Sequence, residues 1–262
     1  MIDVAAYLSR IGYEGGLSPT LATLKGLHEA HVGAIVFENV NPLSGQPVNL
    51  DSAFLEDKIV RQGRGGYCFE LNLLFGDLLR EMGFAVTPLI ARVWMGVRAP
   101  RQRSHSFLKV DIDGEPWIAD VGFGGIGLLE PIPLRDGAEV ELPLASFRLQ
   151  QEGELWVMQS SLPTRWFDLY GFTLEPQERI DFEAPNYFIA THPSSPFTKN
   201  LVLAKVERTR RIRLVNRQLT IVTEKGAEEQ QLASGEEVAA VVRDLLNLEI
   251  APDIVPDAPP AL

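Results

Sequence analysis

Hydrophobic residues recur at helical spacing through the first third of the chain. Between Cys68 and Met82 they return every three or four positions, and Gly83 stands where such a helix would end. Ser18, before a proline, and Asp51 provide start signals for two earlier helices. The same spacing predicts helices over residues 3–11, 19–31 and 51–63. We therefore expect a helical bundle over residues 1–83.

After Gly83 the pattern changes to short runs with the two-residue alternation of β-strands. Asp113-Gly114 and Glu152-Gly153 provide turns between neighbouring runs. The predicted strands cover residues 86–93, 104–112, 116–121, 147–151, 155–159 and 166–169. Antiparallel strands at this spacing form a barrel or a sandwich. A helical segment around Phe182–Ile189 comes next, followed by a turn-rich loop.

The last part of the chain combines strands with one helix. Strands are predicted over residues 201–208, 211–216 and 218–222, and Ser234 with Glu237 predicts a capping box that opens a helix as far as Leu246. The expected fold class is α+β, divided into a helical part (1–83), a β-rich part (84–190) and a mixed part (191–250). Four prolines predict a loose tail over residues 251–262.

Composition and charge narrow the class of protein. A hydrophobic content of 45% and a charged content of 23% are typical of soluble globular proteins. The net charge of −11 disfavours a nucleic acid as partner. One cysteine allows no internal disulfide, which fits a reducing compartment. An acidic N-terminus and the lack of an apolar run of about 18 residues predict a cytoplasmic protein without a membrane partner.

The only cysteine lies in the segment Arg64-Gly65-Gly66-Tyr67-Cys68-Phe69-Glu70, in the first turn of the predicted helix. Free backbone N–H groups and the positive end of the helix dipole favour a thiolate there. We expect the two glycines to let the backbone turn sharply and to let another molecule approach the sulfur. Most lone cysteines are small buried hydrophobic residues, so catalysis requires a histidine and a carboxylate within reach.

A histidine and an aspartate flank the Asp113-Gly114 turn. If these two residues form the whole loop, Ile112 faces Glu115 in the hairpin. His105 and Asp120 then lie on one face as diagonal neighbours, about 7–8 Å apart at Cα. Asp120 would orient His105, and His105 would take the proton of the cysteine, which completes a triad.

Several segments of the chain match motifs of one enzyme family. Residues 64–70 resemble its nucleophile motif, and Val36-Phe37-Glu38-Asn39 resembles an upstream Phe-Glu-Asn segment, with valine where proline is common. Further matches are His105-Ser106-Phe107, Asp120-Val121-Gly122-Phe123-Gly124 and Thr191-His192-Pro193-Ser194-Ser195. In this order, and as far as about residue 250, the chain resembles the arylamine N-acetyltransferases.

The resemblance implies three subdomains around a cysteine-protease-like Cys-His-Asp core. These are an N-terminal helical bundle with the cysteine, a central antiparallel β-barrel with the histidine and aspartate, and a C-terminal α/β lid. It also implies a ping-pong reaction, in which Cys68 takes an acetyl group from acetyl-coenzyme A and passes it to an arylamine, hydrazine or arylhydroxylamine. His105 would act as acid and base, acetyl-coenzyme A would be the cosubstrate, and no metal would take part.

The resemblance gives further residues a place near the site. Three aromatic residues match positions that line the acceptor pocket in similar proteins: Phe37, Phe123 and Phe197. Glu38 and Arg64 are expected to form a buried structural pair, next to Gly65 and Gly66. His28 and His31 lie one turn apart on a helix, but no third ligand with metal spacing accompanies them, so we predict no metal site.

Three other functions are compatible with the sequence. An amide synthase that closes a macrolactam would use the same catalytic residues and differ in its acyl donor. A transglutaminase-like or papain-like hydrolase would share the order Cys, His, Asp, although an aromatic pocket disfavours water as acceptor. A non-enzymatic binding module with a relic site would have no reason to keep three reactive groups aligned.

Overall fold

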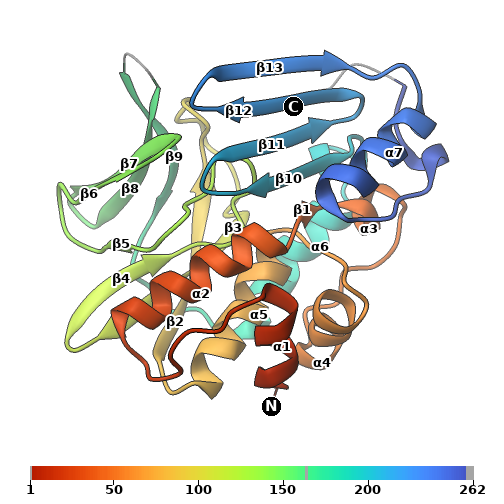
Figure 1. Cartoon of the computed structure of the whole chain (residues 1–262). Coiled ribbons are helices and arrows are strands. Elements are labelled where there is room, and N and C mark those ends of the chain that lie inside the picture. The colour runs from red at the N-terminus through yellow and green to blue at the C-terminus, as the bar shows by residue number, and fades with distance from the viewer. Residues whose placement is uncertain (1, 163–164, 258–262) are drawn as a thin grey trace.

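The computed structural model describes residues 2–162 and 165–257 of the chain. Figure 1 shows its three parts, with the N-terminal helices in red and orange, a strongly curved sheet in green, and a second sheet in blue that lies across the helices. Helices and antiparallel sheets occupy separate regions, which confirms the predicted α+β class.

The N-terminal part is helical, as predicted. Its elements are α1 (Val4–Ile11), α2 (Leu21–Ala34), α3 (Val40–Leu43), α4 (Ser52–Leu55), the π-helical turn η1 (Glu56–Arg61) and α5 (Cys68–Glu81). Helix α2 begins later than predicted, because Thr20 and not Ser18 accepts the backbone N–H of Thr23, 3.3 Å away. Asp51 precedes α4, but its side chain makes no capping hydrogen bond. After α5, Gly83 has the left-handed φ of +86° expected of a helix stop.

The central part is a nearly closed antiparallel barrel, not a sandwich. Its strands are β2 (Ala85–Val93), β3 (His105–Ile112), β4 (Glu115–Ala119), β5 (Ile132–Pro133), β6 (Glu139–Leu142), β7 (Ala145–Glu152), β8 (Leu155–Leu162) and β9 (Arg165–Phe172). They follow the order β5-β4-β3-β2-β9-β8-β7-β6. Phe107, Ile118, Leu149 and Tyr170 point from different strands into one buried cluster, which fills the interior.

The hairpin between β3 and β4 has the predicted register. Ile112 pairs with Glu115, and the ladder continues to Leu108 and Ala119. Asp113 and Gly114 both have positive φ, 52° and 84°, as a two-residue type I′ turn requires. This turn therefore determines which residues of the two strands share a face.

The second sheet combines one N-terminal strand with four C-terminal strands. Its order is β1 (Phe37–Glu38), β10 (Val202–Val206), β11 (Arg210–Val215), β12 (Gln218–Thr223) and β13 (Gly226–Gln231). Strand β13 was not predicted, because all its residues are exposed and it has no apolar alternation. We propose that the subdomains are divided at residues 83 and 190. Strand β1 belongs to the first subdomain by sequence but pairs with β10 in the sheet of the third.

One face of this sheet packs against α7 (Gly235–Leu246). Ser234 accepts the backbone N–H of Glu237, 3.3 Å away, but the carboxylate of Glu237 accepts from Ala233, one residue before the position that a capping box implies. In the tail Ala251, Pro252 and Asp253 are exposed and Val255 is buried, 6% exposed; a loose tail remains a prediction. Residues 258–262 lie outside the described residues.

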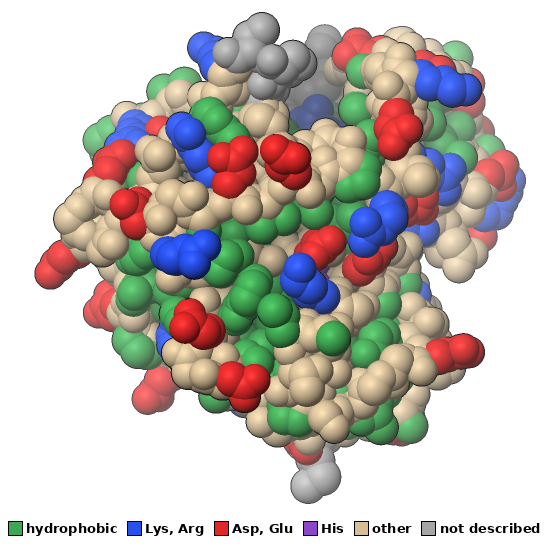
Figure 2. All heavy atoms as spheres, turned by 60° about the vertical axis from the view of Figure 1, so that its left-hand side comes forward, with side chains coloured by type: hydrophobic (Ala, Val, Ile, Leu, Met, Phe, Trp, Pro, Cys, Tyr) green, Lys and Arg blue, Asp and Glu red, His purple; other side chains and the backbone are tan. Residues whose placement is uncertain are grey.

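Three short helical elements lie between the barrel and β10: η2 (Arg179–Phe182), α6 (Glu183–Thr191) and η3 (Pro196–Thr198). A fourth, η4 (Pro252–Ile254), follows α7 in the tail. Figure 2 shows hydrophobic side chains gathered across the middle of one face, with acidic and basic side chains scattered around them. Within residues 2–162 and 165–257, no helix has the length and apolar character needed to cross a membrane.

Candidate active site

The cysteine occupies the first position of helix α5, as the sequence predicts. Cys68 is only 5% exposed, and its sulfur lies 3.6 Å from the backbone oxygen of Ser104, just before β3. The carboxylate of Glu70 accepts the N–H of Tyr67, 3.1 Å away, at the start of the helix. The thiol is therefore held at a helix N-terminus, where a negative charge is favoured.

The glycine pair before the cysteine has a different role from the expected one. Residues 36–38 run alongside it, with the N–H of Gly66 3.3 Å from the oxygen of Val36 and the N–H of Glu38 2.9 Å from the oxygen of Gly66. A Cβ on Gly65 would lie 2.0 Å from the oxygen of Val36. A Cβ on Gly66 would lie 2.8 Å from Cβ of Glu70. Gly65 thus makes room for the backbone of Val36 and Gly66 for the side chain of Glu70, and neither glycine has a positive φ.

His105 and Asp120 lie together at the end of the hairpin. His105 is the first residue of β3, Asp120 follows the last residue of β4, and Nε2 of the ring is 2.7 Å from Oδ2 of the carboxylate. Burial lowers the pKa of His105, but the charge and hydrogen bond of Asp120, together with Cys68, outweigh burial and raise it to about 10. The imidazole is therefore a cation at neutral pH, and Nδ1 is the ring nitrogen left for another partner.

Asp120 is surrounded by donors. Oδ2 also accepts from the hydroxyl of Tyr170, and Oδ1 accepts from Asn72 and from the N–H of Gly122, each at 3.1 Å. Burial raises the pKa of Asp120, but the charge of His105 and these hydrogen bonds outweigh it and hold the pKa below its ordinary value. The carboxylate therefore stays ionised.

Asn72 connects the cysteine helix to β3 and to the segment that follows β4. It lies one turn after the cysteine in α5, donates to the oxygen of Ser106 at 2.8 Å, and accepts the N–H of Val121 at 3.0 Å. The hydroxyl of Ser106 in turn donates to the oxygen of Cys68, 2.9 Å away. Asn72 is not among the residues predicted for the site; its position one turn after the cysteine was the available signal.

His28 supports Asp120 from the opposite side. Its Nε2 accepts the backbone N–H of Asp120, and its Nδ1 faces the oxygen of Leu129, each at 3.1 Å. Burial lowers the pKa of His28 to about 4, so the ring is neutral. His31 contacts the hydroxyl of Tyr7 at 2.6 Å. Both histidines are buried, and no group of residues suited to a metal occurs in the described part of the chain.

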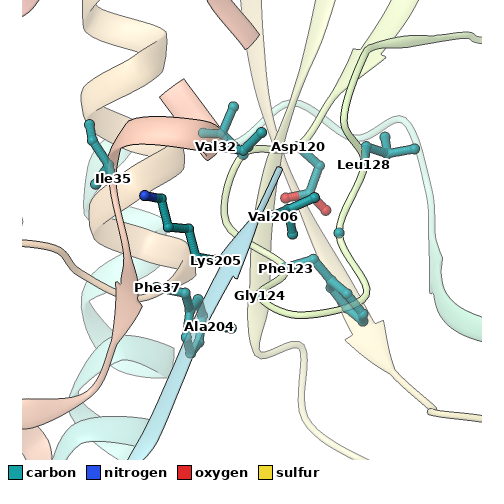
Figure 3. A pocket seen from close by; sticks show the side chains of 12 residues that line it. Val32, Ile35, Phe37, Asp120, Phe123, Gly124, Leu128, Ala204, Lys205 and Val206 are labelled. Atoms are coloured by element: carbon teal, nitrogen blue, oxygen red, sulfur yellow. The ribbon is translucent and has the colours of Figure 1, made fainter. Parts of the chain in front are cut away.

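The three aromatic residues have different neighbours in the site. The ring of Phe123 is 4.9 Å from that of His105, and the rings of Phe37 and Phe197 are 6.0 Å apart. Phe37 and Phe123 line a small cavity together with Asp120 (Figure 3), whereas Phe197 does not. Its volume of about 10 Å³ is that of a single water molecule. An aromatic acceptor would therefore have to displace side chains there.

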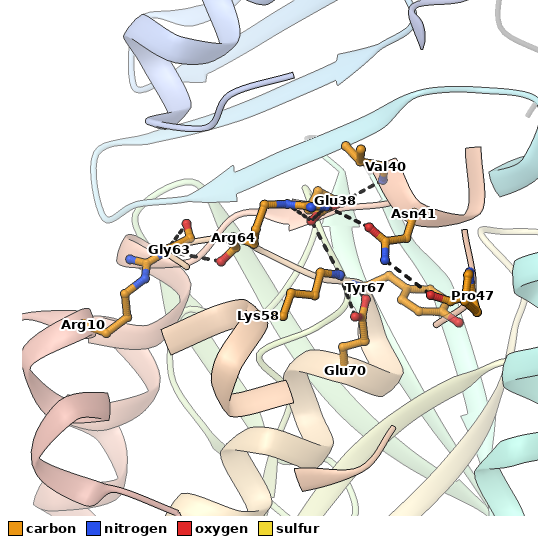
Figure 4. A network of polar contacts seen from close by, with 10 residues as sticks. All are labelled: Arg10, Glu38, Val40, Asn41, Pro47, Lys58, Gly63, Arg64, Tyr67 and Glu70. Atoms are coloured by element: carbon orange, nitrogen blue, oxygen red, sulfur yellow. Dashed lines mark hydrogen bonds and ion pairs between the residues drawn. The ribbon is translucent and has the colours of Figure 1, made fainter. Parts of the chain in front are cut away.

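A network of buried charges lies at the start of α5 (Figure 4). Arg64 donates to Glu38 at 2.6 Å, and Lys58, 4% exposed, lies 2.6 Å from Glu70 and 3.7 Å from Glu38. Burial disfavours the ionised form of Glu38, but Lys58 and Arg64 outweigh it and lower its pKa. Burial, aided by Glu38, raises the pKa of Glu70 although Lys58 opposes it. The pair of Glu38 and Arg64 was predicted from the sequence, whereas the part of Lys58 in the network was not.

Comparisons with known proteins agree with this geometry. A family profile described as N-acetyltransferase matches residues 20–255. The arylamine N-acetyltransferase of Mycolicibacterium smegmatis is 36% identical over 256 residues, covering 95% of this chain and 93% of the relative. The arylamine N-acetyltransferase / N-hydroxyarylamine O-acetyltransferase of Salmonella typhimurium is 39% identical over 201 residues, covering 76% and 72%.

Solved structures share the whole fold. The arylamine N-acetyltransferase of Mycobacterium marinum superposes with a TM-score of 0.92 at 36% identity, covering 96% of this chain and 94% of that one. The structure of the Mycobacterium marinum enzyme in complex with CoA gives 0.92 at 35% identity, covering 97% of each chain. The helical bundle, barrel and second sheet thus form an N-acetyltransferase fold. The chain belongs to the arylamine N-acetyltransferase family.

Proposed function

We propose that this protein transfers an acetyl group from acetyl-coenzyme A to an arylamine or hydrazine, with Cys68, His105 and Asp120 as catalytic residues. The observation that carries the proposal is the buried pair of His105 and Asp120, 2.7 Å apart, beside a cysteine at a helix N-terminus. Family membership and the CoA complex of the Mycobacterium marinum relative support acetyl-coenzyme A as donor.

The first half-reaction loads the enzyme. The thiolate of Cys68 attacks the carbonyl carbon of acetyl-coenzyme A, a new C–S bond forms, and the bond to the coenzyme sulfur breaks. The protonated ring of His105 gives its proton to the departing coenzyme thiolate. One thioester replaces another, so this step is nearly balanced in free energy.

The second half-reaction transfers the acetyl group from Cys68 to the amine. The amine nitrogen attacks the acetyl carbon, the C–N bond forms, and the C–S bond to Cys68 breaks. His105 takes the proton that the nitrogen loses, and the cysteine returns to the thiolate. Asp120 stays ionised throughout, keeps Nε2 of the ring facing it, and stabilises the imidazolium.

Other residues support this chemistry. We propose that the aromatic ring of the amine substrate contacts the side chains of Phe37, Phe123 and Phe197, which can make stacking and edge-to-face contacts with it. Glu38, Arg64, Gly65 and Gly66 hold the segment before the cysteine and take no part in proton transfer. We also propose a cytoplasmic location, because a chain with one reactive cysteine and no internal disulfide suits a reducing compartment.

Steady-state kinetics of coenzyme A release test the proposal. With acetyl-coenzyme A and 4-anisidine varied together, the ping-pong mechanism predicts parallel double-reciprocal lines, and Cys68→Ala predicts no release. Lines that intersect would contradict a covalent intermediate. Without any amine the mechanism allows release of one equivalent of coenzyme A per enzyme, so release that continues over many turnovers would instead indicate a hydrolase. Activity only with a larger acyl thioester would indicate an amide synthase.

A further inference from the structure

Two arginines of β11 lie on the face of the second sheet that α7 does not cover. Ile212 and Leu214 belong to the cluster under α7, and side chains alternate along a strand, so Arg211 and Arg213 point to the other face. On this face Arg213 pairs with Ala204, and Ala204 pairs with Phe37. The two arginines therefore lie on the face of the sheet opposite α7.

Both arginines contact the loop that follows Asp120. Arg211 donates to the oxygen of Gly125, 3.2 Å away. A Cβ on Gly125 would lie 3.5 Å from both Cβ and Cδ of Arg213, so the stem of that side chain lies directly over the glycine. Two residues earlier in the same loop, Phe123 contacts the ring of His105. The guanidinium of Arg213 is thus carried by a strand that packs on the wall of the catalytic site.

Neither arginine has an acidic partner within residues 2–162 and 165–257. Arg211 is 7% exposed, its Nε has no hydrogen-bond partner there, and its guanidinium lies over the ring of Phe147. Burial alone lowers its pKa to about 10, since no carboxylate offsets the burial. Arg213 is exposed and makes no hydrogen bond or ion pair with a described residue. By contrast, Arg210 on the same strand pairs with Glu207.

This arrangement is unusual in a chain with 35 acidic and 24 basic residues. A buried cation is costly unless an anion accompanies it, and the planar fork of a guanidinium matches the oxygens of a carboxylate or phosphate. We propose that Arg213, with Arg211 behind it, binds an oxyanion of a substrate beside the loop of Phe123. The oxyanion is a phosphate of acetyl-coenzyme A or a carboxylate on the arylamine. The inference rests on the proposed function, because its ligands are the substrates of that reaction.

Substrate pairs that differ only in the oxyanion test the proposal. We would measure kcat/KM of Arg213→Gln with acetyl-coenzyme A against S-acetylpantetheine, and with 4-aminobenzoate against 4-anisidine. We expect a loss of about tenfold for the anionic member of one pair and less than about twofold for its neutral counterpart. A loss confined to acetyl-coenzyme A assigns the phosphate, and a loss confined to 4-aminobenzoate assigns the carboxylate.

Two control variants sharpen the result. Arg210→Gln removes the same charge from the same strand, and we expect it to leave all four values within about twofold. Arg213→Lys keeps the charge and should retain most of the preference for the anionic substrate. Equal values for Arg213→Gln and wild type with every substrate, or an equal loss with all four, would overturn the proposal.

Calorimetry separates this proposal from the proposed function. In the Cys68→Ser background no acetyl transfer can occur, yet coenzyme A, pantetheine and both amines can still be titrated into the protein with and without Arg213→Gln. If wild type fails to form acetyl-Cys68, the proposed function fails, while these titrations still decide whether Arg213 binds an oxyanion. Unchanged affinities for both anionic ligands would count against Arg213 even if the enzyme is active.

Discussion

The imidazole of His28 accepts a hydrogen bond from the backbone N–H of Asp120, 3.1 Å away, and so joins helix α2 to the residue that orients His105. A backbone N–H can only donate, so Nε2 carries no proton and Nδ1 donates to the oxygen of Leu129. His28 thus holds both ends of the segment from Asp120 to Leu129. The neutral form of His28 is therefore needed to hold Asp120 in its position.

Replacing His28 should impair acetyl transfer without touching a reacting atom. In His28→Leu the N–H of Asp120 loses its partner, and we expect a stability loss of about 1–3 kcal/mol and a roughly tenfold lower kcat with KM for acetyl-coenzyme A little changed. His28→Gln keeps one acceptor and one donor and should recover part of both losses. Denaturant unfolding and steady-state kinetics measure them. Wild-type kcat in His28→Leu would remove this positioning role.

Asp120→Asn should leave the fold nearly intact and nearly abolish transfer. The amide cannot supply the negative charge that holds Nε2–H of His105 and stabilises the imidazolium, so the ring loses its orientation and its proton. We expect a loss of about 10³–10⁴-fold in kcat/KM for acetyl-coenzyme A. Transfer within tenfold of wild type would show that Asp120 is not part of the mechanism.

The raised pKa of His105 predicts a pH dependence of stability. The folded state holds this proton up to about pH 10, whereas the unfolded chain releases it near the ordinary pKa of about 6.5. The stability that protonated His105 contributes is therefore full below about pH 6.5 and is lost as the pH rises through about 10. The stability difference between wild type and Asp120→Asn should shrink over this window. A difference that grows with pH would have the wrong sign.

In the charge network at the start of α5, we expect the replacement of Lys58 to cost the most stability. Lys58→Met leaves Glu70 without its partner at 2.6 Å, and we expect a loss of about 3–5 kcal/mol in the free energy of unfolding. Adding Glu70→Gln should restore part of that loss. Arg243→Met, which breaks the exposed pair with Asp244, is the matched control and should cost less than about 0.5 kcal/mol. Equal losses for Lys58 and Arg243 would refute the buried network.

Local signals in the sequence were enough to predict the position of the two strand residues. The Asp113-Gly114 turn determines the register of β3 and β4, and that register brings His105 and Asp120 to one face. The helix start at Cys68 was likewise visible from apolar spacing and the following glycine stop. Both predictions depend on neighbours within a few positions along the chain.

Contacts between distant segments could not be predicted in this way. His28 reaches Asp120 across 92 positions, and Arg211 reaches Gly125 across 86, so no local pattern indicates either contact. Gly65 and Gly66 indicate that the backbone there needs space on one side. The sequence alone does not show that Val36 and Glu70 fill this space. Strand β13 has only exposed residues and therefore lacks the alternation from which strands are predicted.

Acetyl transfer through Cys68 is tested most directly by the intact mass of the protein after brief incubation with acetyl-coenzyme A and no amine. We expect one acetyl adduct on wild type that disappears when an arylamine is added, and none on Cys68→Ser. An adduct that persists in Cys68→Ser, or no adduct on wild type with any acyl thioester, would contradict acetyl transfer through this cysteine.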